Sequence, residues 1–263
     1  MPDTKRAVFL KISGEKLSGS SISKGCWDKT ALIRNAQNIS AAHTKLNGLG
    51  ISVLTIICGG GNIARGDKLK GENISPRYAD VVGRGATILN TIVLADTLQA
   101  ASIPCEIFIA TKMSYNDPSI ATIPYTPEAL KSAHAQGKVC LIAGGTGEDN
   151  VTTDNAVVLY ASSYRKVFDG EVIVLKSTQF DGVFESDPKT NPEARRYKSI
   201  SAQSMLNDYE RFKVVDKTSL TNLVKHSLTM RVYDENEHDL AEMLNGKNGG
   251  TIIVPTDAKA VYY

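Results

Sequence analysis

The chain has 263 residues, of which 42% are hydrophobic, 22% charged and 6% aromatic. That apolar fraction excludes global disorder, and a net charge of +2, from 30 basic and 28 acidic residues, excludes a strongly basic nucleic-acid-binding protein. No apolar run approaches the roughly 20 residues of a transmembrane helix, and no signal-peptide pattern follows Met1, so we expect a cytoplasmic protein that does not enter a membrane.

Apolar runs alternate with helical periodicity through the first half of the chain. Buried strands are predicted at residues 7–12, 52–58, 106–110 and 138–143. Helices are predicted at residues 28–46, with Asp28 as the cap, at residues 77–101, and from Thr126, which is the expected N-cap before Pro127.

The second half continues this pattern. It predicts a helix from about Asp154, a strand at residues 172–175, helices near Ser201 and Lys217, a strand at 228–233, a helix near His238 and a strand at 251–254. Asp181-Gly182, within residues 180–184, predicts a tight β-hairpin. Strands rich in Val, Ile and Leu between helices predict an α/β fold, a three-layer α/β/α sandwich with a mainly parallel central sheet. No linker divides the chain, so we expect one domain over residues 1–263.

The cysteines and histidines carry no metal-site pattern. The four cysteines form no C-x-x-C pair, and Cys58, Cys105 and Cys140 lie in or beside apolar runs, as reduced core cysteines do. The four histidines are far apart in sequence. We therefore predict no metal-ligating residues.

Two loops that follow predicted strands have the composition of phosphate sites, and such strand ends are where α/β sheets bind ligands. Lys11 precedes Ser13-Gly14, which offers an ammonium group and close backbone approach, although a solvated lysine before an ordinary turn explains the same residues. Gly59-Gly60-Gly61, followed by Arg65, offers backbone amides and a bidentate donor to an anion. The alternative for this second loop is a plain flexible segment.

Two further loops follow the fourth and fifth strands. Residues 144–154 supply glycines, three threonine hydroxyls and Asp154, which either caps a helix or organises cationic groups. Residues 175–188 are long enough to form one wall of a nucleobase pocket, or are simply a hairpin. The sequence contains neither G-x-x-x-x-G-K-[ST] nor G-x-G-x-x-G, so phosphoryl transfer would depend on several loops rather than on one motif.

Taken together, six stretches resemble one family. They are LKISGE (residues 10–15), GGGNIARG (59–66), DVVGRGATILN (80–90), GTG with TTD (145–154), LKSTQFDGVFESDP (175–188) and KVVD (213–216). Their order and spacing over residues 7–254 resemble the bacterial uridylate (UMP) kinases of the amino-acid kinase superfamily.

The resemblance implies a role for each matching residue. For ATP it implies contacts by Lys11, Ile12, Ser13, Gly14, Gly61, Arg65, Thr178, Phe184 and Asp187. For UMP it implies contacts by Gly60, Asp80, Thr146, Gly147, Glu148, Asp149, Asn150, Val151, Thr152 and Thr153. Lys11, Arg65, Asp154 and Asp216 are the implied catalytic residues, the two aspartates orienting the lysines and the substrate.

The same resemblance implies an activity and an assembly. The expected reaction moves the γ-phosphoryl group of ATP to UMP and yields UDP for pyrimidine nucleotide biosynthesis, with Mg²⁺ carried by the nucleotide. A homohexamer activated by GTP and inhibited by UTP is expected. Residues 1–165 would form the lobe for the acceptor nucleotide, and residues 166–263 the lobe for ATP.

The acceptor loop departs from the family pattern. Glu148-Asp149-Asn150-Val151 stands where the family usually has Asn-Pro-Phe-Phe. The two carboxylates face a loop that must admit a phosphate dianion, so we expect their neutralisation to lower the KM for UMP. Two other interpretations stay open: a kinase of the superfamily with another acceptor (a different nucleotide, a small phosphate ester or a carboxylate), and a nucleotide-binding relative without catalysis.

Overall fold

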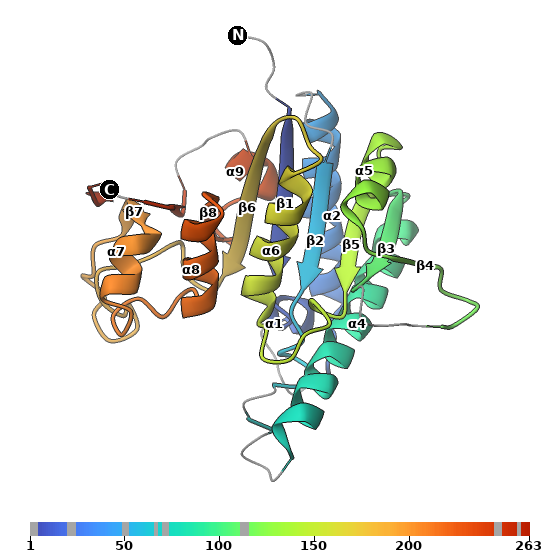
Figure 1. Ribbon diagram of the computed structural model, residues 1–263, viewed down its shortest axis with the longest axis horizontal. Helices are drawn as coiled ribbons and strands as arrows, with labels where there is room; N and C mark the ends of the chain where they lie inside the picture. The colour runs from blue at the N-terminus through green and yellow to red at the C-terminus, as the bar shows by residue number, and fades with distance from the viewer. Residues whose placement is uncertain are drawn as a thin grey trace.

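The computed structural model describes residues 5–19, 25–48, 53–65, 68–69, 74–110, 116–244, 249–256 and 259–263. Ser52 of the predicted second strand and Gly66 of the second loop lie outside these residues. The described strands form one ten-stranded sheet in the order β10-β7-β9-β8-β6-β1-β2-β5-β3-β4, with helices on both faces (Figure 1).

The elements follow the predicted alternation of strands and helices. The strands are β1 (Arg6–Ile12), β2 (Val53–Cys58), β3 (Cys105–Ile109), β4 (Thr122–Pro124), β5 (Val139–Ala143), β6 (Glu171–Thr178), β7 (Tyr197–Ser201), β8 (Thr229–Asp234), β9 (Thr251–Val254) and β10 (Val261–Tyr262). The helices are α1 (Glu15–Ser18), α2 (Lys29–Gly48), α4 (Pro76–Ala100), α5 (Pro127–Ala135), α6 (Thr153–Arg165), α7 (Ala202–Asn207), α8 (Lys217–Lys225) and α9 (Leu240–Leu244).

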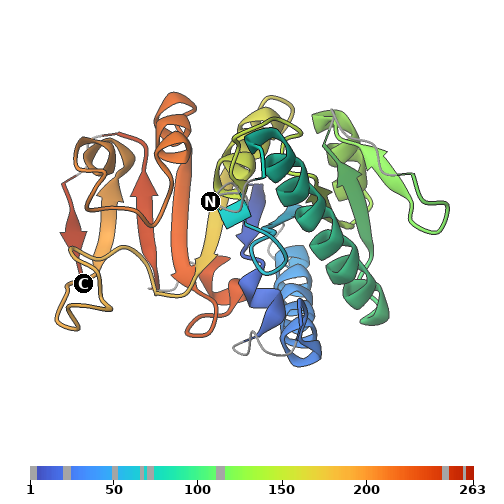
Figure 2. The same ribbon diagram turned by 90° about the horizontal axis from the view of Figure 1, so that it is seen from below.

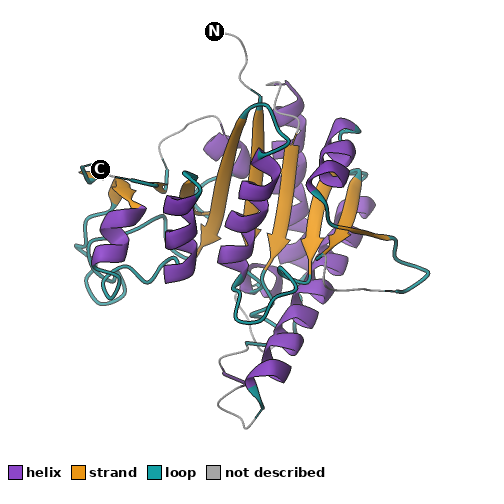
Figure 3. Cartoon of the chain, in the orientation of Figure 1, coloured by secondary structure: helices purple, strands orange, loops and turns teal. Residues whose placement is uncertain are grey.

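The predicted three-layer α/β/α sandwich is confirmed. Every neighbouring pair from β8 across to β4 is parallel, whereas β9 runs antiparallel to β8 and β10 antiparallel to β7. Figure 3 shows the central strands as one layer between helices. Figure 2, seen from the end at which the central strands finish, shows α6 and α8 on one side of the sheet and α1 and α2 on the other.

The central strands are apolar throughout because both of their faces are covered. In β1, Phe9 packs into the core beneath α5, α6, α7 and α8, while Leu10 packs into the core beneath α1, α2, α4 and α9. β1 also lies between β2 and β6, with Ala7 level with Val53 and Val172. The carboxyl ends of three strands therefore meet at one edge of the sheet.

The predicted helix starts agree with the structure. The Asp28 carboxylate accepts a hydrogen bond from the Ala31 amide at 2.8 Å, and the Thr126 hydroxyl accepts one from the Ala129 amide at 3.0 Å. Among the described helices, α4 alone is long and apolar enough to cross a membrane, but its buried residues pack against the sheet, as those of a core helix do. The four cysteines are free, and Cys58 and Cys140 are buried.

The predicted hairpin at residues 180–184 is wrong. β6 pairs with β1 and β8, and Phe184 forms only an isolated bridge with Arg196. Asp181 is buried and contacts Arg196 and the ring of His238 rather than closing a local turn. Contacts with residues distant in sequence therefore fix the conformation of the Asp181-Gly182 pair in place of a hairpin turn.

Candidate active site

Two glycine-bearing loops pack against each other at the carboxyl edge of the sheet. The Gly59 amide donates to the Ile12 carbonyl at 2.8 Å, which joins the end of β2 to the end of β1. A Cβ atom at Gly14 would lie 2.8 Å from the Gly59 carbonyl oxygen. A Cβ atom at Gly60 would lie 2.8 Å from the Ala86 Cβ in α4. The glycines are therefore required by close packing, which argues against a plain flexible loop.

A buried asparagine fixes the second loop from below. Asn90 of α4 is fully buried and donates to the Gly59 carbonyl at 2.6 Å. The Trp27 indole donates to the Asn90 side-chain oxygen at 2.8 Å, and the Asn62 amide does so at 3.2 Å. A buried amide with its hydrogen bonds made holds a loop in one conformation.

Two lysines share one carboxylate where β1, β6 and α6 meet. Lys11 lies 3.1 Å from Asp154, and Lys176 of β6 forms a very short contact with the other oxygen of the same carboxylate. Burial by itself would raise the pKa of Asp154, but the two ammonium groups outweigh it and hold that pKa well below its usual range. Asp154 thus organises cations, and the cap of α6 is Thr152, whose hydroxyl accepts from the Asn155 amide at 3.0 Å.

Asp216 joins two helix starts at this edge. Its carboxylate caps α8 by accepting from the Ser219 amide at 2.9 Å, and it also accepts from the Thr152 hydroxyl at 2.7 Å. Thr152 therefore links the start of α6 to the start of α8. The negative charge of Asp216 also opposes the lowering of the Lys176 pKa by burial, so Asp216 acts on the second lysine of the pair.

Arg65 is paired at the mouth of the site. Its guanidinium contacts the Glu15 carboxylate, and both side chains remain partly exposed. Burial would raise the pKa of Glu15, but its own backbone amide and Arg65 lower it. Glu15 is therefore ionised, and its carboxylate holds Arg65 beside the glycine loops.

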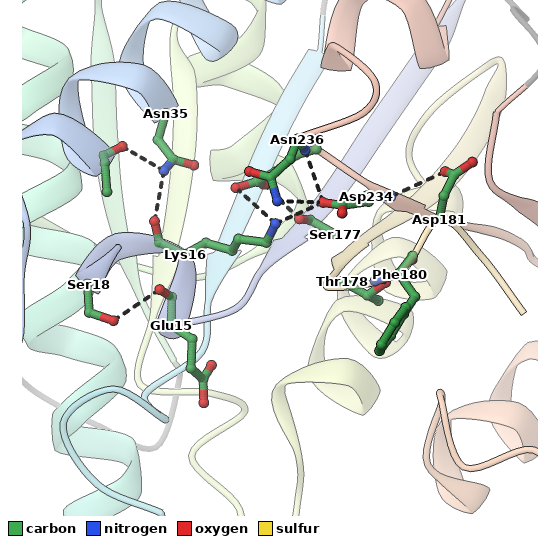
Figure 4. A network of polar contacts seen from close by, with 12 residues as sticks. Glu15, Lys16, Ser18, Asn35, Ser177, Thr178, Phe180, Asp181, Asp234 and Asn236 are labelled. Atoms are coloured by element: carbon green, nitrogen blue, oxygen red, sulfur yellow. Dashed lines mark hydrogen bonds and ion pairs between the residues drawn. The ribbon is translucent and has the colours of Figure 1, made fainter. Parts of the chain in front are cut away.

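A network of polar contacts behind the first loop connects it to the end of β8 (Figure 4). Lys16 of α1 is buried and lies 3.0 Å from Asp234 at the end of β8. Its carbonyl accepts from the Asn35 side chain at 3.2 Å, and its own amide donates to the Ser13 carbonyl at 3.1 Å. The turn at Ser13-Gly14 is consequently fixed relative to both α2 and β8.

A cavity of about 450 Å³ opens at this edge and gathers most of the predicted residues. Those that line it are Lys11, Ser13, Gly14, Gly60, Gly61, Arg65, Asp80, Glu148, Asn150, Val151, Thr152 and Thr153. Ile12 does not, because its side chain is buried in the core. Thr146 and Gly147 form the turn that leads into the loop.

A second hollow of about 370 Å³ lies beyond Lys176. It contains the predicted residues Thr178, Phe184 and Asp187, which bring an aromatic ring and a carboxylate to one wall. Lys176 donates to the Val214 carbonyl at 2.5 Å, and Val214 lines this hollow. Lys176 and Asp154 therefore stand between the two hollows.

The structure also adds residues that the sequence did not single out. Lys176, Asn90 and Arg84 each contact a predicted loop, and the strand-end position of Lys176, like that of Lys11, is the one signal that could have marked it. Asn90 and Arg84 lie within the family-like stretch 80–90, but the helical pattern there does not separate them from its other residues.

Comparison with known proteins agrees with this geometry. Residues 14–240 match the amino acid kinase family. A uridylate kinase of Deinococcus radiodurans is 32% identical over 253 residues, 96% of each chain, and one of Coxiella burnetii is 31% identical over 249 residues, 94% of this chain and 95% of the relative.

Solved structures agree as well. The crystal structure of a UMP kinase from Bacillus anthracis superposes with a TM-score of 0.81 at 26% identity, over 98% of this chain and 99% of the other. A UMP kinase from Ureaplasma parvum gives 0.79 at 26% identity, over 95% and 99%. Full-length matches in sequence and structure, with glycine loops and paired cations at one sheet edge, lead to one conclusion: the chain belongs to the amino acid kinase family, among the uridylate kinases.

Proposed function

We propose that this protein transfers the γ-phosphoryl group of ATP to UMP and forms UDP. The observation that carries the proposal is the Lys11–Asp154–Lys176 group, which stands between two separate hollows. One hollow is bounded by the acceptor loop and the other by the Thr178–Asp187 segment. Such an arrangement suits two nucleotides that meet at their phosphates.

The donor occupies the second hollow in this proposal. The ring of Phe184 offers a stacking surface to the base, and Thr178 and Asp187 offer polar contacts to the adenosine. The phosphate chain then runs toward Lys11 and Gly14. Mg²⁺ enters as part of the MgATP substrate, and we assign it no ligand from the protein.

The acceptor occupies the first cavity. Its phosphate lies against Gly60, with Gly61 and Arg65 on the ATP side of the same loop, its ribose lies near Asp80, and its base lies against residues 146–153. Uracil has one N–H donor between two carbonyl acceptors. The hydroxyl groups of Thr152 and Thr153 and the amide of Asn150 have the donors and acceptors that such an edge needs.

The chemistry depends on positioning and charge. Phosphoryl transfer passes through a state in which negative charge spreads over the transferred group, so cations and amides fixed in advance stabilise it. Lys11 faces the cavity, and Asp154 holds its ammonium in place. The acceptor phosphate is already ionised at neutral pH, so the reaction needs no general base.

Several wider properties belong to the same proposal. We assign the acceptor to residues 1–165 and ATP to residues 166–263, and we place the protein in the cytoplasm, in pyrimidine nucleotide biosynthesis. A homohexamer activated by GTP and inhibited by UTP is the assembly that the family resemblance favours. UTP carries the same base as UMP, which makes the acceptor pocket one place where it could bind.

The test is an acceptor panel of UMP, dUMP, CMP, AMP and GMP with MgATP. The formation of ADP and of each nucleoside diphosphate is measured. We expect UMP to give the highest kcat/KM. Comparable rates with CMP or AMP would contradict the uracil assignment, and nucleotide binding without turnover would contradict the kinase assignment.

A further inference from the structure

Arg84 lies in the wall of the acceptor cavity, on the face of α4 that also carries Asp80 and Thr87. Its stem passes over the acceptor loop, since a side chain at Gly145 would meet the Arg84 Cγ at 3.9 Å. The Arg84 side chain is only 16% exposed, although α4 is open to solvent along much of its length. A guanidinium held this closely is a fixed part of the cavity.

One nitrogen of Arg84 bridges two points of the acceptor loop. Nη1 donates to the Asp149 carboxylate at 2.7 Å and to the Glu148 carbonyl at 3.1 Å. One turn earlier in α4, the Asp80 carboxylate accepts from the Asn150 amide at 2.9 Å. Three consecutive loop residues are therefore attached to one helix face.

The loop needs such attachment because of its backbone. Asn150 has a φ of 58°, in the left-handed region that only some residues tolerate, and Gly145 and Gly147 also have positive φ. The base of the loop is fixed where the Gly144 amide donates to the Thr87 hydroxyl at 3.0 Å. The contacts of Arg84 and Asp80 extend this fixation to the stretch that faces the nucleoside.

Charge gives Arg84 a second effect on the same loop. Asp149 is half-exposed and is not among the residues that line the cavity, although its neighbours Glu148 and Asn150 are. Pairing with Arg84 compensates its charge and so reduces the repulsion that the sequence predicts for Asp149.

We propose that Arg84 is a positioning residue for the acceptor: through Asp149 and the Glu148 carbonyl, it holds residues 148–150 against α4 and so sets the affinity of the acceptor pocket. The inference rests on the proposed function, because it assigns this cavity to the acceptor nucleotide. It also reverses the earlier expectation for Asp149, whose loss should weaken acceptor binding.

A double-mutant cycle tests this. Arg84→Met keeps the apolar stem and removes the guanidinium, and Asp149→Ala removes its carboxylate partner. We expect Arg84→Met to raise the KM for UMP about fivefold while kcat and the KM for ATP stay within twofold, since a partly exposed ion pair contributes modestly. Asp149→Ala should raise the same KM by a smaller factor, because the bond to the Glu148 carbonyl remains.

The non-additivity of the cycle tests whether Arg84 acts together with Asp149. If Arg84 acts through the loop, Arg84→Met should have a clearly smaller effect in the Asp149→Ala background. Equal effects in both backgrounds, an unchanged KM, or an equal rise in the KM for ATP would overturn the proposal. Arg77→Met, at an exposed arginine of the same helix, is the matched control and should leave all constants unchanged.

The design also distinguishes failure of the proposed function. The cycle is measured with whichever nucleotide of the panel reacts fastest, so a different acceptor would contradict the UMP assignment and still test Arg84. If none reacts, calorimetric titration of the four proteins with UMP gives Kd values that replace the KM values. Melting curves for every variant identify any loss of folding.

Discussion

Two lysines at neighbouring strand ends have different surroundings, and the proposed function gives them different roles. Lys11 lines the first cavity, whereas Lys176 is 6% exposed and donates to the Val214 carbonyl behind it. Burial lowers the pKa of Lys176. The charge of Asp154 opposes this lowering, and the charge of Lys11 adds to it. Lys176 is therefore best suited to fixing Asp154, and Lys11 to meeting the transferred phosphoryl group.

Replacing Lys11 by alanine should reduce turnover far more than stability. The ammonium group is expected to meet charge that develops in the transition state, and loss of one such contact typically reduces kcat on the order of 10²–10³-fold. Lys176 still compensates Asp154 in the variant, which protects the fold. Steady-state kinetics and a melting curve measure both properties.

Lys29→Ala is the control, because Lys29 is an exposed lysine at the start of α2. It should behave as wild type. A kcat near the wild-type value in Lys11→Ala, with an intact melting curve, would remove Lys11 from the active site.

Phe184 supplies the matching test on the donor side. Its ring lines the second hollow, and stacking of a base on an aromatic ring is worth about 1–3 kcal/mol, so Phe184→Ala should raise the KM for ATP about tenfold or more. The KM for UMP should stay within twofold. The same kinetic series, with each substrate varied in turn, measures the split, and a rise in the KM for UMP alone would reverse the assignment of the two hollows.

At the level of elements, His134 links a strand and two helices. This buried residue of α5 contacts the Thr55 hydroxyl in β2 at 3.1 Å and the Tyr164 hydroxyl in α6 at 3.0 Å. Burial lowers its pKa from 6.5 to about 3. Between these values the unfolded chain binds a proton that the folded protein does not, so stability falls as the pH falls below 6.5.

His134→Gln should flatten this dependence. From pH 7 to pH 5, the wild type should lose about 2 kcal/mol more of its free energy of unfolding than the variant does. Urea unfolding at the two pH values, at one protein concentration, measures the difference. The other histidines are present in both proteins, so their contributions to the pH dependence cancel in the comparison. An equal loss of unfolding free energy in wild type and variant would mean that His134 is protonated in the folded state.

The elements were largely predictable, and the cross-chain contacts were not. Strands such as β1 and β5 follow from continuous apolar runs, and the start of α5 follows from a threonine cap before proline, because both signals are local. β7 escaped prediction, since its sequence YKSIS has no apolar run. Lys16 and Asp234 are 218 residues apart, so only the folded sheet reveals that they meet.

The same limit applies to the site. Glycine loops and the lysine at the end of β1 carry their chemistry in local residue types, and the cavity brings them together. The partner of Asp149 lies 65 residues away on the outer part of α4. The sequence alone shows the two carboxylates of the loop but not the arginine that pairs with one of them. This is why the sequence predicted repulsion between the loop and a phosphate group.

At the scale of the whole molecule, both hollows open beside one sheet. Helix α4 extends beyond that sheet (Figure 1). The outer surface of α4 leaves large apolar side chains exposed: Tyr78 by 68%, Val81 and Leu89 by 45% and Val82 by 43%. Side chains of this kind on one helix mark an interaction surface more often than a solvated one. They favour self-association along α4, in keeping with the proposed hexamer.

We therefore expect an oligomer in solution, and we expect it to depend on this helix. Light scattering at micromolar concentration should give a mass several times the 28.4 kDa of one chain. Val82→Asp with Leu89→Asp should shift the mass to smaller species, because a charge buried without a partner opposes association. Val261→Asp, which places the same charge on an exposed apolar residue of β10, should leave the mass unchanged. A wild-type mass of one chain would contradict self-association, whereas an unchanged oligomer in the α4 variant would place the contact on another surface.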